Sequence, residues 1–400
     1  MAQKAIREFD VKNMFFDYIK HNYNGYFISS LDDFKDIKEN KKYVIKPDEL
    51  FGKRGKLGLL GINLEKNELI TWYKEKISKE IEINSLKGFL KNFIVEEFIP
   101  HDEEFYVSIT SKREGDELTF SNFGGIDIEE NWEKTKSILI SPLEKLNKEL
   151  ILKNFGVKDE KILQVIIDLF NFYRDFDFAY LEVNPFCFNK ETKELVILDM
   201  VAKLDNTAFF KHNSWNNISF PNSFGSIDLE NEKYIMDLDE KTGASLKLKF
   251  LNLEGSIWLL LSGGGGSLVI TDTLGYLGYS KEIANYGELS GDPTREYTFE
   301  YTKVLIEQML KSKNAKYLII AGAIANFTQI DKTFLGIIDV LDIYYKEIIE
   351  KDIKILVRRG GLNDKIGLKL LKDTCDKYGI KYTLTGSETY MTDILKEIKL

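Results

Sequence analysis

The chain has 400 residues, of which 44% are hydrophobic and 13% aromatic, and it carries a formal net charge of −9. This length predicts two or three domains, and this composition is too apolar for a disordered chain. The acidic balance argues against a nucleic-acid partner, which needs a basic face, but it leaves room for a local basic pocket that binds a small anion. No run of about 18 apolar residues is found, so we expect no membrane-spanning helix.

The first ten residues are charged and lack the apolar segment of a secretory signal, so we expect a cytoplasmic protein. The two cysteines, Cys187 and Cys375, have no CxxC partner, which predicts free thiols rather than a disulfide framework or a zinc site. Lysine outnumbers arginine by 48 to 7. An arginine kept against this bias is more often needed for its planar guanidinium, which draws attention to Arg54, Arg358 and Arg359.

The first half of the chain mixes strand-like and helix-like patterns, as in an α+β domain. The clearest helical spacing is at Lys161–Tyr173, where apolar residues recur on one face. The polar stretch Asn213–Asp228 predicts a linker. Strand-like apolar segments occur at Tyr43–Lys46, Phe93–Ile99, Phe105–Thr110, Ala179–Asn184 and Leu195–Met200.

The second half has a different rhythm, in which apolar strands alternate with helical segments. Strands are expected at Ile257–Leu261, Tyr317–Ile320, Ile353–Val357 and Ile380–Leu384, and helices near Phe299–Leu310, Phe334–Ile349, Lys365–Tyr378 and Thr389–Ile398. This alternation predicts a flavodoxin-like, doubly wound parallel sheet with right-handed crossovers. The whole chain is therefore expected to be α/β, with subdomains at residues 1–96 and 97–225 and the flavodoxin-like domain at 226–400.

Three polar clusters follow three of these strands: Ser262–Ser267, Gly322–Thr328 and Arg358–Gly361. The carboxyl ends of parallel strands meet at one edge of a sheet, where open α/β sheets bind their ligands. A glycine run before a helix presents backbone N–H groups to an anion, and an inward-facing guanidinium holds a carboxylate with two hydrogen bonds. Each cluster alone fits an ordinary turn, helix cap or solvated charge pair. Together they predict a small ligand with several carboxylates or phosphates.

Basic, glycine-rich sequence follows the first of the predicted strands, where Lys46–Asp48 is succeeded by Lys53–Lys56. Cations on such a loop fit a triphosphate, although a solvated lysine-rich hairpin explains the pattern equally well. Further along, Asn184 and Asp199 end two predicted strands. They offer the oxygen ligands that Mg²⁺ prefers, with isolated turn residues as the alternative.

Ten short motifs, in order along nearly the whole chain, form a pattern far more specific than any single loop. They are Val44–Asp48, Lys53–Gly58, Gly88–Phe93, Glu104–Val107, Leu169–Tyr173, Tyr180–Pro185, Thr242–Lys247, Ala284–Glu288, Ile324–Thr328 and Val357–Gly361. With these motifs the chain resembles the N-terminal region of ATP-citrate lyase, which in split enzymes is a separate small subunit. It is more distantly similar to the β-subunit of succinate–CoA ligase.

The resemblance implies an ATP-grasp fold for the first half and a citrate-binding, flavodoxin-like domain for the second. On the family's pattern, the contacts to ATP are Lys46, Arg54, Gly55, Glu97, Ile99 and Glu104, and the ligands of Mg²⁺ are Asn184 and Asp199. A further metal-binding loop matches Asp239, Thr242 and Ala244, and the citrate contacts match Gly291, Asn326, Thr328, Tyr344 and Arg359. Ala323, where the family often has Ser, and Asp292, beside Gly291, are departures that bear on citrate affinity.

The family's chemistry passes through a phosphohistidine, and none of the three histidines, His21, His101 and His212, follows a glycine-rich loop. The resemblance therefore implies that this chain contains no catalytic residue of its own. It implies a hetero-oligomer with a larger subunit that supplies the phosphohistidine, most of the CoA site and the CoA-ligase and citrate-synthase-like domains. Such an assembly converts citrate, ATP and CoA to acetyl-CoA, oxaloacetate, ADP and phosphate through citryl phosphate and citryl-CoA, a reaction of the reductive tricarboxylic acid cycle.

Three alternative functions remain open at this point. The large subunit of citryl-CoA synthetase differs in its partner, which lacks the citrate-synthase-like domain. A succinate–CoA ligase β-subunit is disfavoured because Asn326, Thr328 and Arg359 suit a tricarboxylate. A non-catalytic citrate-sensing or assembly subunit is disfavoured by the intact candidate nucleotide residues Lys46 and Arg54.

Overall fold

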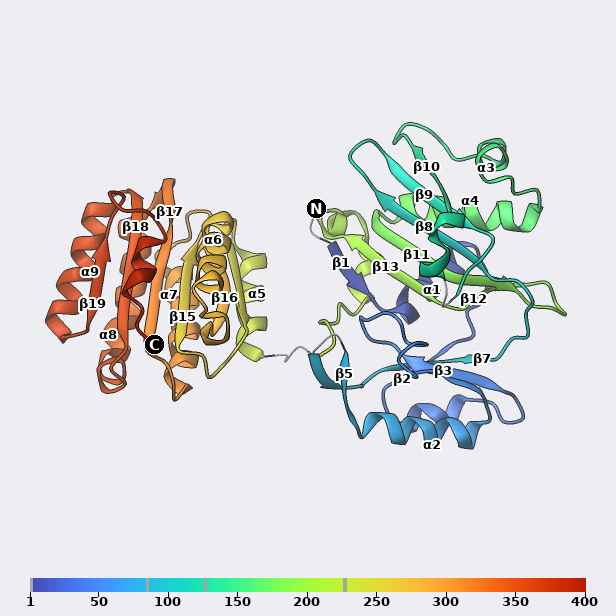
Figure 1. Cartoon of the computed structure of the whole chain (residues 1–400), viewed down its shortest axis with the longest axis horizontal. Coiled ribbons are helices and arrows are strands. Elements are labelled where there is room, and N and C mark those ends of the chain that lie inside the picture. The colour runs from blue at the N-terminus through green and yellow to red at the C-terminus, as the bar shows by residue number, and fades with distance from the viewer. Residues whose placement is uncertain (1–2, 84–85, 126–127, 226–228) are drawn as a thin grey trace. The chain divides into compact units, whose positions relative to one another are not determined.

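The chain folds as two units, Met1–Ile227 and Asp228–Leu400, which run from blue to green and from yellow to red in Figure 1. The computed structural model describes residues 3–83, 86–125, 128–225 and 229–400. The division lies close to the domain boundary expected at residue 226, a position that is itself outside the described residues, as are residues 227 and 228 of the expected linker.

The larger lobe of the first unit is an antiparallel sheet. Its strands lie in the order β1 (Gln3–Ile6), β13 (Met200–Asp205), β11 (Phe178–Phe188), β8 (Phe105–Ser111), β9 (Asp116–Ser121) and β10 (Lys136–Ile140), and β12 (Leu195–Ile197) pairs with β11. One face is covered by α1 (Glu8–Tyr18), α3 (Lys148–Phe155) and α4 (Glu160–Asp175). Strand alternation buries Leu181 and Val183 under these helices and turns Glu182 and Asn184 to the opposite face.

The smaller lobe of the first unit is a sheet with the order β2 (Tyr26–Ile28), β7 (Phe93–Glu97), β3 (Tyr43–Pro47) and β4 (Gly61–Leu64). Helix α2 (Lys66–Ile77) packs against it, as Figure 1 shows, and a hairpin of β5 (Glu80–Ile83) and β6 (Leu86–Phe89) follows. Its own core includes Ile45, Phe93 and Val95. Two separately packed lobes in one unit match the ATP-grasp fold that the resemblance implies.

The second unit is built on parallel strands β15 (Ile257–Ser262), β17 (Tyr317–Gln329), β18 (Lys354–Leu362) and β19 (Tyr382–Thr385). On the other side of β15, a parallel bridge between Ile257 and Ile283 brings in β16 (Asn285–Ser290), which pairs antiparallel with β14 (Ser245–Phe250). Numbered along the chain, the parallel strands therefore lie in the order 2-1-3-4-5, the flavodoxin-like arrangement. The predicted fold class is confirmed.

A buried side chain helps to hold β16 beside β15. The amide of Asn285 donates to the carbonyl of Leu259 at 2.7 Å and accepts from the N–H of Leu259 at 2.8 Å. It thus replaces two bonds that a neighbouring strand would otherwise make.

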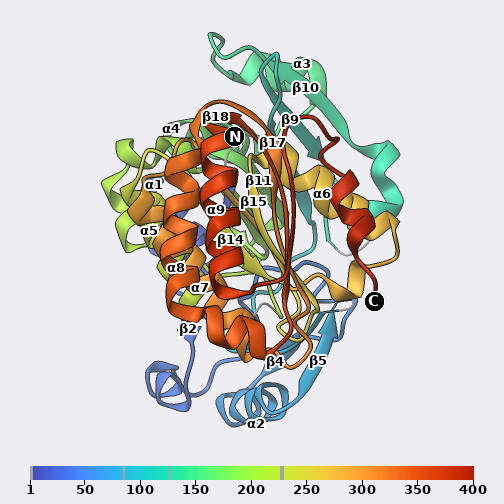
Figure 2. The same ribbon diagram turned by 90° about the vertical axis from the view of Figure 1, so that its left-hand side faces the viewer.

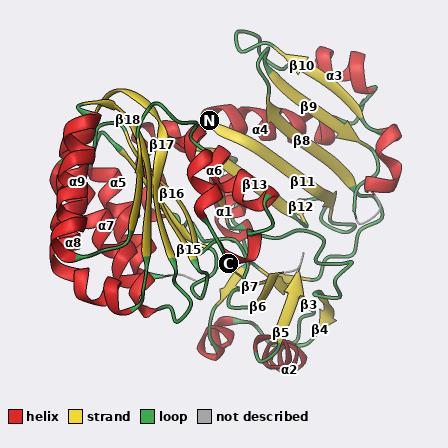
Figure 3. Cartoon of the chain, turned by 60° about the vertical axis from the view of Figure 1, so that its left-hand side comes forward, coloured by secondary structure: helices red, strands yellow, loops and turns green. Residues whose placement is uncertain are grey.

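Helices cover both faces of this sheet. One core joins it to α5 (Glu230–Lys241), α7 (Arg295–Lys311), α8 (Ile330–Glu350) and α9 (Asp364–Tyr378). The other joins it to α6 (Gly264–Tyr276) and to the 3₁₀ turn Asp393–Glu397 (Figures 2 and 3). Among the described residues, no helix is long and apolar enough to cross a membrane.

Three details of the sequence prediction are wrong. The predicted strand Leu195–Met200 is interrupted, because β12 ends at Ile197 and β13 begins at Met200. The predicted helix Thr389–Ile398 is only the short 3₁₀ turn Asp393–Glu397, and the carbonyl of Thr389 accepts from the guanidinium of Arg358 at 2.7 and 3.0 Å. The predicted linker begins inside the first unit, where Trp215 is 1% exposed and stacks on His212.

Candidate functional site

The two predicted phosphate-binding cations lie together in the first unit. Lys46 is the last residue but one of β3, and Arg54 lies in the loop that follows, where its guanidinium donates to the carbonyl of Pro47 at 2.9 Å. Both side chains are buried, with 4% and 6% exposed. Arg54 also pairs with the carboxylate of Asp199, which brings a predicted metal ligand to the same place. Gly55 follows Arg54 directly in this loop.

A carboxylate that the sequence analysis did not single out lies between these cations. Glu8, at the start of α1, is 2.6 Å from Lys46 and 2.8 Å from Arg54. Burial by itself raises the pKa of Glu8, but Lys12, Lys46 and Arg54 together hold that pKa well below its usual value. Glu8 is therefore a carboxylate anion at neutral pH.

Lys12 completes this buried cluster. Its ammonium is fully buried and lies 2.7 Å from both Glu8 and Glu96. Burial alone lowers the pKa of Lys12, and the two carboxylates more than reverse that effect. The sequence held one signal for this pair: Glu8 and Lys12 are four residues apart on the face of α1 that also carries the buried Phe15.

The two predicted Mg²⁺ ligands of the first unit lie on neighbouring strands. Asn184 was expected to end its strand, but it lies inside β11, which continues to Phe188, and Asp199 directly precedes β13. The N–H of Asn184 donates to the carbonyl of Asp199 at 3.0 Å, and the side-chain oxygen of Asn184 accepts from the N–H of Gly125 at 2.8 Å. Burial raises the pKa of Asp199 to about 6, against the opposing charge of Arg54. An amide oxygen beside a carboxylate is a donor set that suits Mg²⁺.

The remaining predicted nucleotide residues lie on and after β7. Strand alternation turns Glu96 into the cluster and Glu97 outward, where it pairs with Lys41. Ile99 and Glu104 are joined by His101, whose ring nitrogens lie 2.8 Å from the Ile99 carbonyl and 3.0 Å from the Glu104 carboxylate.

The same two contacts act on the pKa of His101. Burial lowers the pKa of His101, but the Ile99 carbonyl and the Glu104 carboxylate outweigh that effect and raise it.

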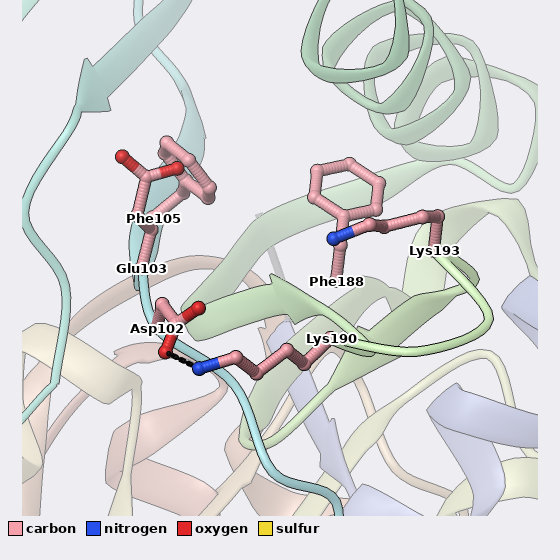
Figure 4. Close-up of a pocket in the computed structure, with 6 residues that line it drawn as sticks. All are labelled: Asp102, Glu103, Phe105, Phe188, Lys190 and Lys193. Carbon is pink, nitrogen blue, oxygen red and sulfur yellow. Dashed lines mark hydrogen bonds and ion pairs between the residues drawn. The ribbon is translucent and has the colours of Figure 1, made fainter.

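Close by, a shallow pocket is lined by Asp102, Glu103, Phe105, Phe188, Lys190 and Lys193 (Figure 4). Lys190 donates to Asp102 across the pocket at 2.9 Å, so these two charges neutralise each other. None of the predicted site residues lines this pocket.

In the second unit, a buried arginine lies close to the point between β15 and β17 where the strand order reverses. Arg359 on β18 is 2% exposed, and Gly322 on β17 pairs with Ser262 on β15. A Cβ atom at Gly322 would lie 2.4 Å from the Arg359 guanidinium and 2.6 Å from the Ser262 carbonyl. Glycine here leaves the space that the guanidinium fills at the ligand-binding edge of the sheet.

No acidic neighbour among the described residues compensates the charge of Arg359. Burial, and to a smaller extent the positive charge of Arg358, lower the pKa of Arg359 to about 10, with no carboxylate acting in the other direction. Arg358 is 4% exposed and donates to the carbonyls of Thr389 and Gly322, the latter at 2.9 Å. The alternative of a solvated charge pair at this position is therefore wrong, because Arg358 is buried and anchors the C-terminal segment.

Three more predicted citrate contacts come to this edge. Gly291 follows β16 with a φ of 78°, and Asp292 beside it accepts from the N–H of Gln329 at 3.0 Å. This bond ties the turn to the end of β17, where Asn326 is exposed and Thr328 is 8% exposed.

Tyr344 does not join them. It lies on α8, about 21 Å along the helix from its first residue at a rise of about 1.5 Å per residue. There its hydroxyl donates to Glu307 of α7. A citrate contact at Tyr344 stays a prediction without local geometry to support it.

The other predicted metal-binding loop connects α5 to β14. The carboxylate of Asp239 accepts from the N–H of Leu246 at 2.7 Å and pairs with Lys247. The hydroxyl of Thr242 accepts from the N–H of Ala244 at 3.1 Å. The residues are thus neighbours, but an ammonium group occupies the carboxylate, so metal binding here stays a prediction. Within the described ranges, no three His, Cys, Asp or Glu side chains gather in a way that could hold a metal ion.

Comparison with known families defines the class of protein. The family model for the ATP-citrate synthase ATP-grasp domain matches residues 2–215, and that for the ATP citrate lyase citrate-binding domain matches residues 228–398. An ATP-grasp domain is thus followed by a citrate-binding domain. The chain belongs to the ATP-citrate synthase family of enzymes, also called ATP-citrate lyases.

Individual relatives show how much of the family's architecture the chain covers. It is 40% identical to ATP-citrate synthase alpha chain protein 2 of Arabidopsis thaliana, over 99% of this chain and 98% of that protein. It is 42% identical to the ATP-citrate synthase of Mus musculus, but spans only 33% of its length. The structure of ATP citrate lyase from Methanothrix soehngenii in complex with citrate and coenzyme A is similar with a TM-score of 0.89, 38% identity and 98% coverage of both chains.

Proposed function

We propose that this chain is the ATP- and citrate-binding subunit of an ATP-citrate lyase. The observation that carries the proposal is the buried guanidinium of Arg359, which has no acidic neighbour at the switch point of the second sheet. A buried cation is stable only when it is paired, so this site calls for an anionic ligand. Asn326, Thr328 and the backbone at Gly291 add polar groups at the same edge, which suits the carboxylates and hydroxyl of citrate.

The first unit is proposed to bind Mg·ATP. Lys46 and Arg54 neutralise phosphate charge, and the backbone of Gly55 and Ile99 with the carboxylates of Glu97 and Glu104 orients the rest of the nucleotide. Mg²⁺ held by Asn184 and Asp199 would further offset the charge of the phosphates. Supporting this role, Lys46, Arg54 and Asp199 converge on one point although 145 residues separate Arg54 from Asp199 in sequence.

Phosphoryl transfer is proposed to need a partner subunit. A histidine of that partner accepts the phosphoryl group from ATP and passes it to citrate held by Arg359, Asn326 and Thr328. Coenzyme A, bound mainly by the partner, then displaces phosphate from citryl phosphate to give citryl-CoA. The mouse relative is about three times as long as the matched region, which is consistent with further domains carried on another chain here.

Purification of the chain from its native source, with whatever co-purifies, tests this function. The complex is expected to form ADP only when both citrate and coenzyme A are present. Acetyl-CoA and oxaloacetate as products support a lyase, whereas accumulation of citryl-CoA identifies the complex as citryl-CoA synthetase. ADP formation with succinate in place of citrate would overturn the assignment.

A further inference from the structure

The two lobes of the first unit are joined by buried charges. Glu8 and Lys12 lie on α1, whose apolar face packs on the larger sheet through Val11 and Phe15. Their partners Lys46, Arg54 and Glu96 belong to the smaller lobe. Because α1 follows β1 directly, the pairing of Ile6 with Ala202 on β13 fixes where Glu8 reaches the cluster.

The ammonium group of Lys46 is already engaged within the protein. It donates to Glu8 at 2.6 Å and to the carbonyl of Leu198, and it lies 3.4 Å from the carboxylate of Glu96. An ammonium group has three N–H donors, so Glu8 holds one that a phosphate oxygen would otherwise bind.

Arg54 is paired with the same carboxylate, although its buried Nε has no hydrogen-bond partner among the described residues. One nitrogen of its guanidinium serves Pro47 and Glu8, and the other terminal nitrogen pairs with Asp199. Counting charges, the cations Lys12, Lys46 and Arg54 are balanced by the carboxylates of Glu8, Glu96 and Asp199. These cations are thus already paired before any nucleotide arrives, and Glu8 is the carboxylate that contacts all three of them.

We propose that Glu8 acts as an internal anion that occupies Lys46 and Arg54 in the absence of nucleotide and is displaced by the nucleotide's phosphates. This rests on the proposed nucleotide-binding role of Lys46 and Arg54. Displacement of Glu8 loosens the start of α1 from the smaller lobe, so nucleotide binding is coupled to the N-terminal helix. Glu8 is a competitor of the ligand and touches no reacting atom.

The substitution Glu8→Gln tests this, since it keeps the size of the side chain and removes its charge. Lys46 and Arg54 then lose a competing anion, so Mg·ATP should bind roughly tenfold more tightly, the effect of about one charge-assisted hydrogen bond. Without nucleotide, the variant should melt at a lower temperature because one buried cation is unpaired. Added Mg·ATP should raise its melting temperature more than that of the wild type.

A matched control is Glu232→Gln in the second unit. Glu232 is also a largely buried carboxylate, 11% exposed at the side chain, and pairs with Lys249. Its substitution should lower the melting temperature but leave the affinity for Mg·ATP unchanged. If Glu8→Gln binds Mg·ATP as weakly as or more weakly than the wild type, Glu8 positions the cations and does not compete, and the proposal is overturned.

Hydrogen exchange on the wild-type chain gives a second test that does not depend on the variant folding. The N–H of Glu8 donates to the side chain of Asp48 at 2.9 Å. Mg·ATP should speed exchange in the first turn of α1 while it protects the loop that contains Arg54. Slower or unchanged exchange of that turn contradicts displacement. Absence of Mg·ATP binding to the wild type would instead refute the proposed function itself.

Discussion

Replacing Arg359 by methionine should weaken citrate binding and stabilise the free protein at the same time. Methionine has a similar length and no charge, so it fills the space beside Gly322 without the buried guanidinium. A pKa near 10 in place of 12.5 corresponds to about 3 kcal/mol of unfavourable free energy for keeping this charge in the folded state. Removing the charge relieves that cost, because the charged form is favoured in the unfolded chain.

The loss in citrate affinity follows from the same guanidinium. Two charge-assisted hydrogen bonds to a carboxylate contribute about 3–6 kcal/mol together, so Arg359→Met should raise the citrate Kd by about 10²- to 10⁴-fold. Isothermal titration calorimetry measures that change. Scanning fluorimetry should show the second unit melting several degrees higher, at about 2–4 °C per kcal/mol for a domain of this size.

The neighbouring arginine supplies the control. Arg358 is equally buried but donates to the carbonyls of Thr389 and Gly322. Arg358→Met leaves these acceptors without a donor and should therefore lower the melting temperature. If Arg359→Met binds citrate like the wild type, or loses stability as Arg358→Met does, the assignment of Arg359 as an uncompensated anion receptor is wrong.

Three further changes have expected outcomes. Lys12→Met strips a fully buried cation from Glu8 and Glu96 and should cost the first unit about 3–5 kcal/mol in chemical denaturation, whereas a loss under 1 kcal/mol would mean that the cluster contributes little. Gly322→Ala places a methyl group against both the carbonyl of Ser262 and the guanidinium of Arg359. It should lower both the melting temperature and the citrate affinity, and unchanged affinity would contradict the close packing at this edge. Because the pKa of Asp199 is raised to about 6, its carboxylate becomes protonated as the pH falls through 6, and Mg·ATP affinity should drop up to about tenfold per pH unit below that value. Calorimetry across this range should show the drop in the wild type and its absence in Asp199→Asn.

The second unit could be predicted well from sequence because its signals are local. Apolar strands alternate with amphipathic helices, and the carboxyl ends of parallel strands must share an edge, so Gly322 and Arg359 were expected together. The alternation of side chains along β18 could not predict which of Arg358 and Arg359 carries the uncompensated charge. That depends on the carbonyl of Thr389, which accepts from Arg358 although 31 residues separate the two in sequence.

The cluster of the first unit shows the opposite case. Lys46, Arg54 and Asp199 were expected near a nucleotide, but Glu8 was missed, because it reaches them only through the pairing of β1 with β13 across the whole unit. A contact of such sequence separation leaves no local pattern. The sequence does place an acid and a base, Glu8 and Lys12, on the apolar face of α1. That pair indicates a buried cluster only once both side chains are known to be buried. Tyr344 is the opposite case. The family resemblance predicts it as a citrate contact, but it lies about four turns along α8 from the other predicted contacts.

The most direct test is a crystal structure of the chain grown with citrate. Electron density for the trianion should lie against the guanidinium of Arg359 on β18, within hydrogen-bonding distance of Asn326 and Thr328 near the end of β17. An empty edge at saturating citrate, or citrate bound elsewhere on the second unit, would contradict the proposal that this buried arginine is the citrate receptor.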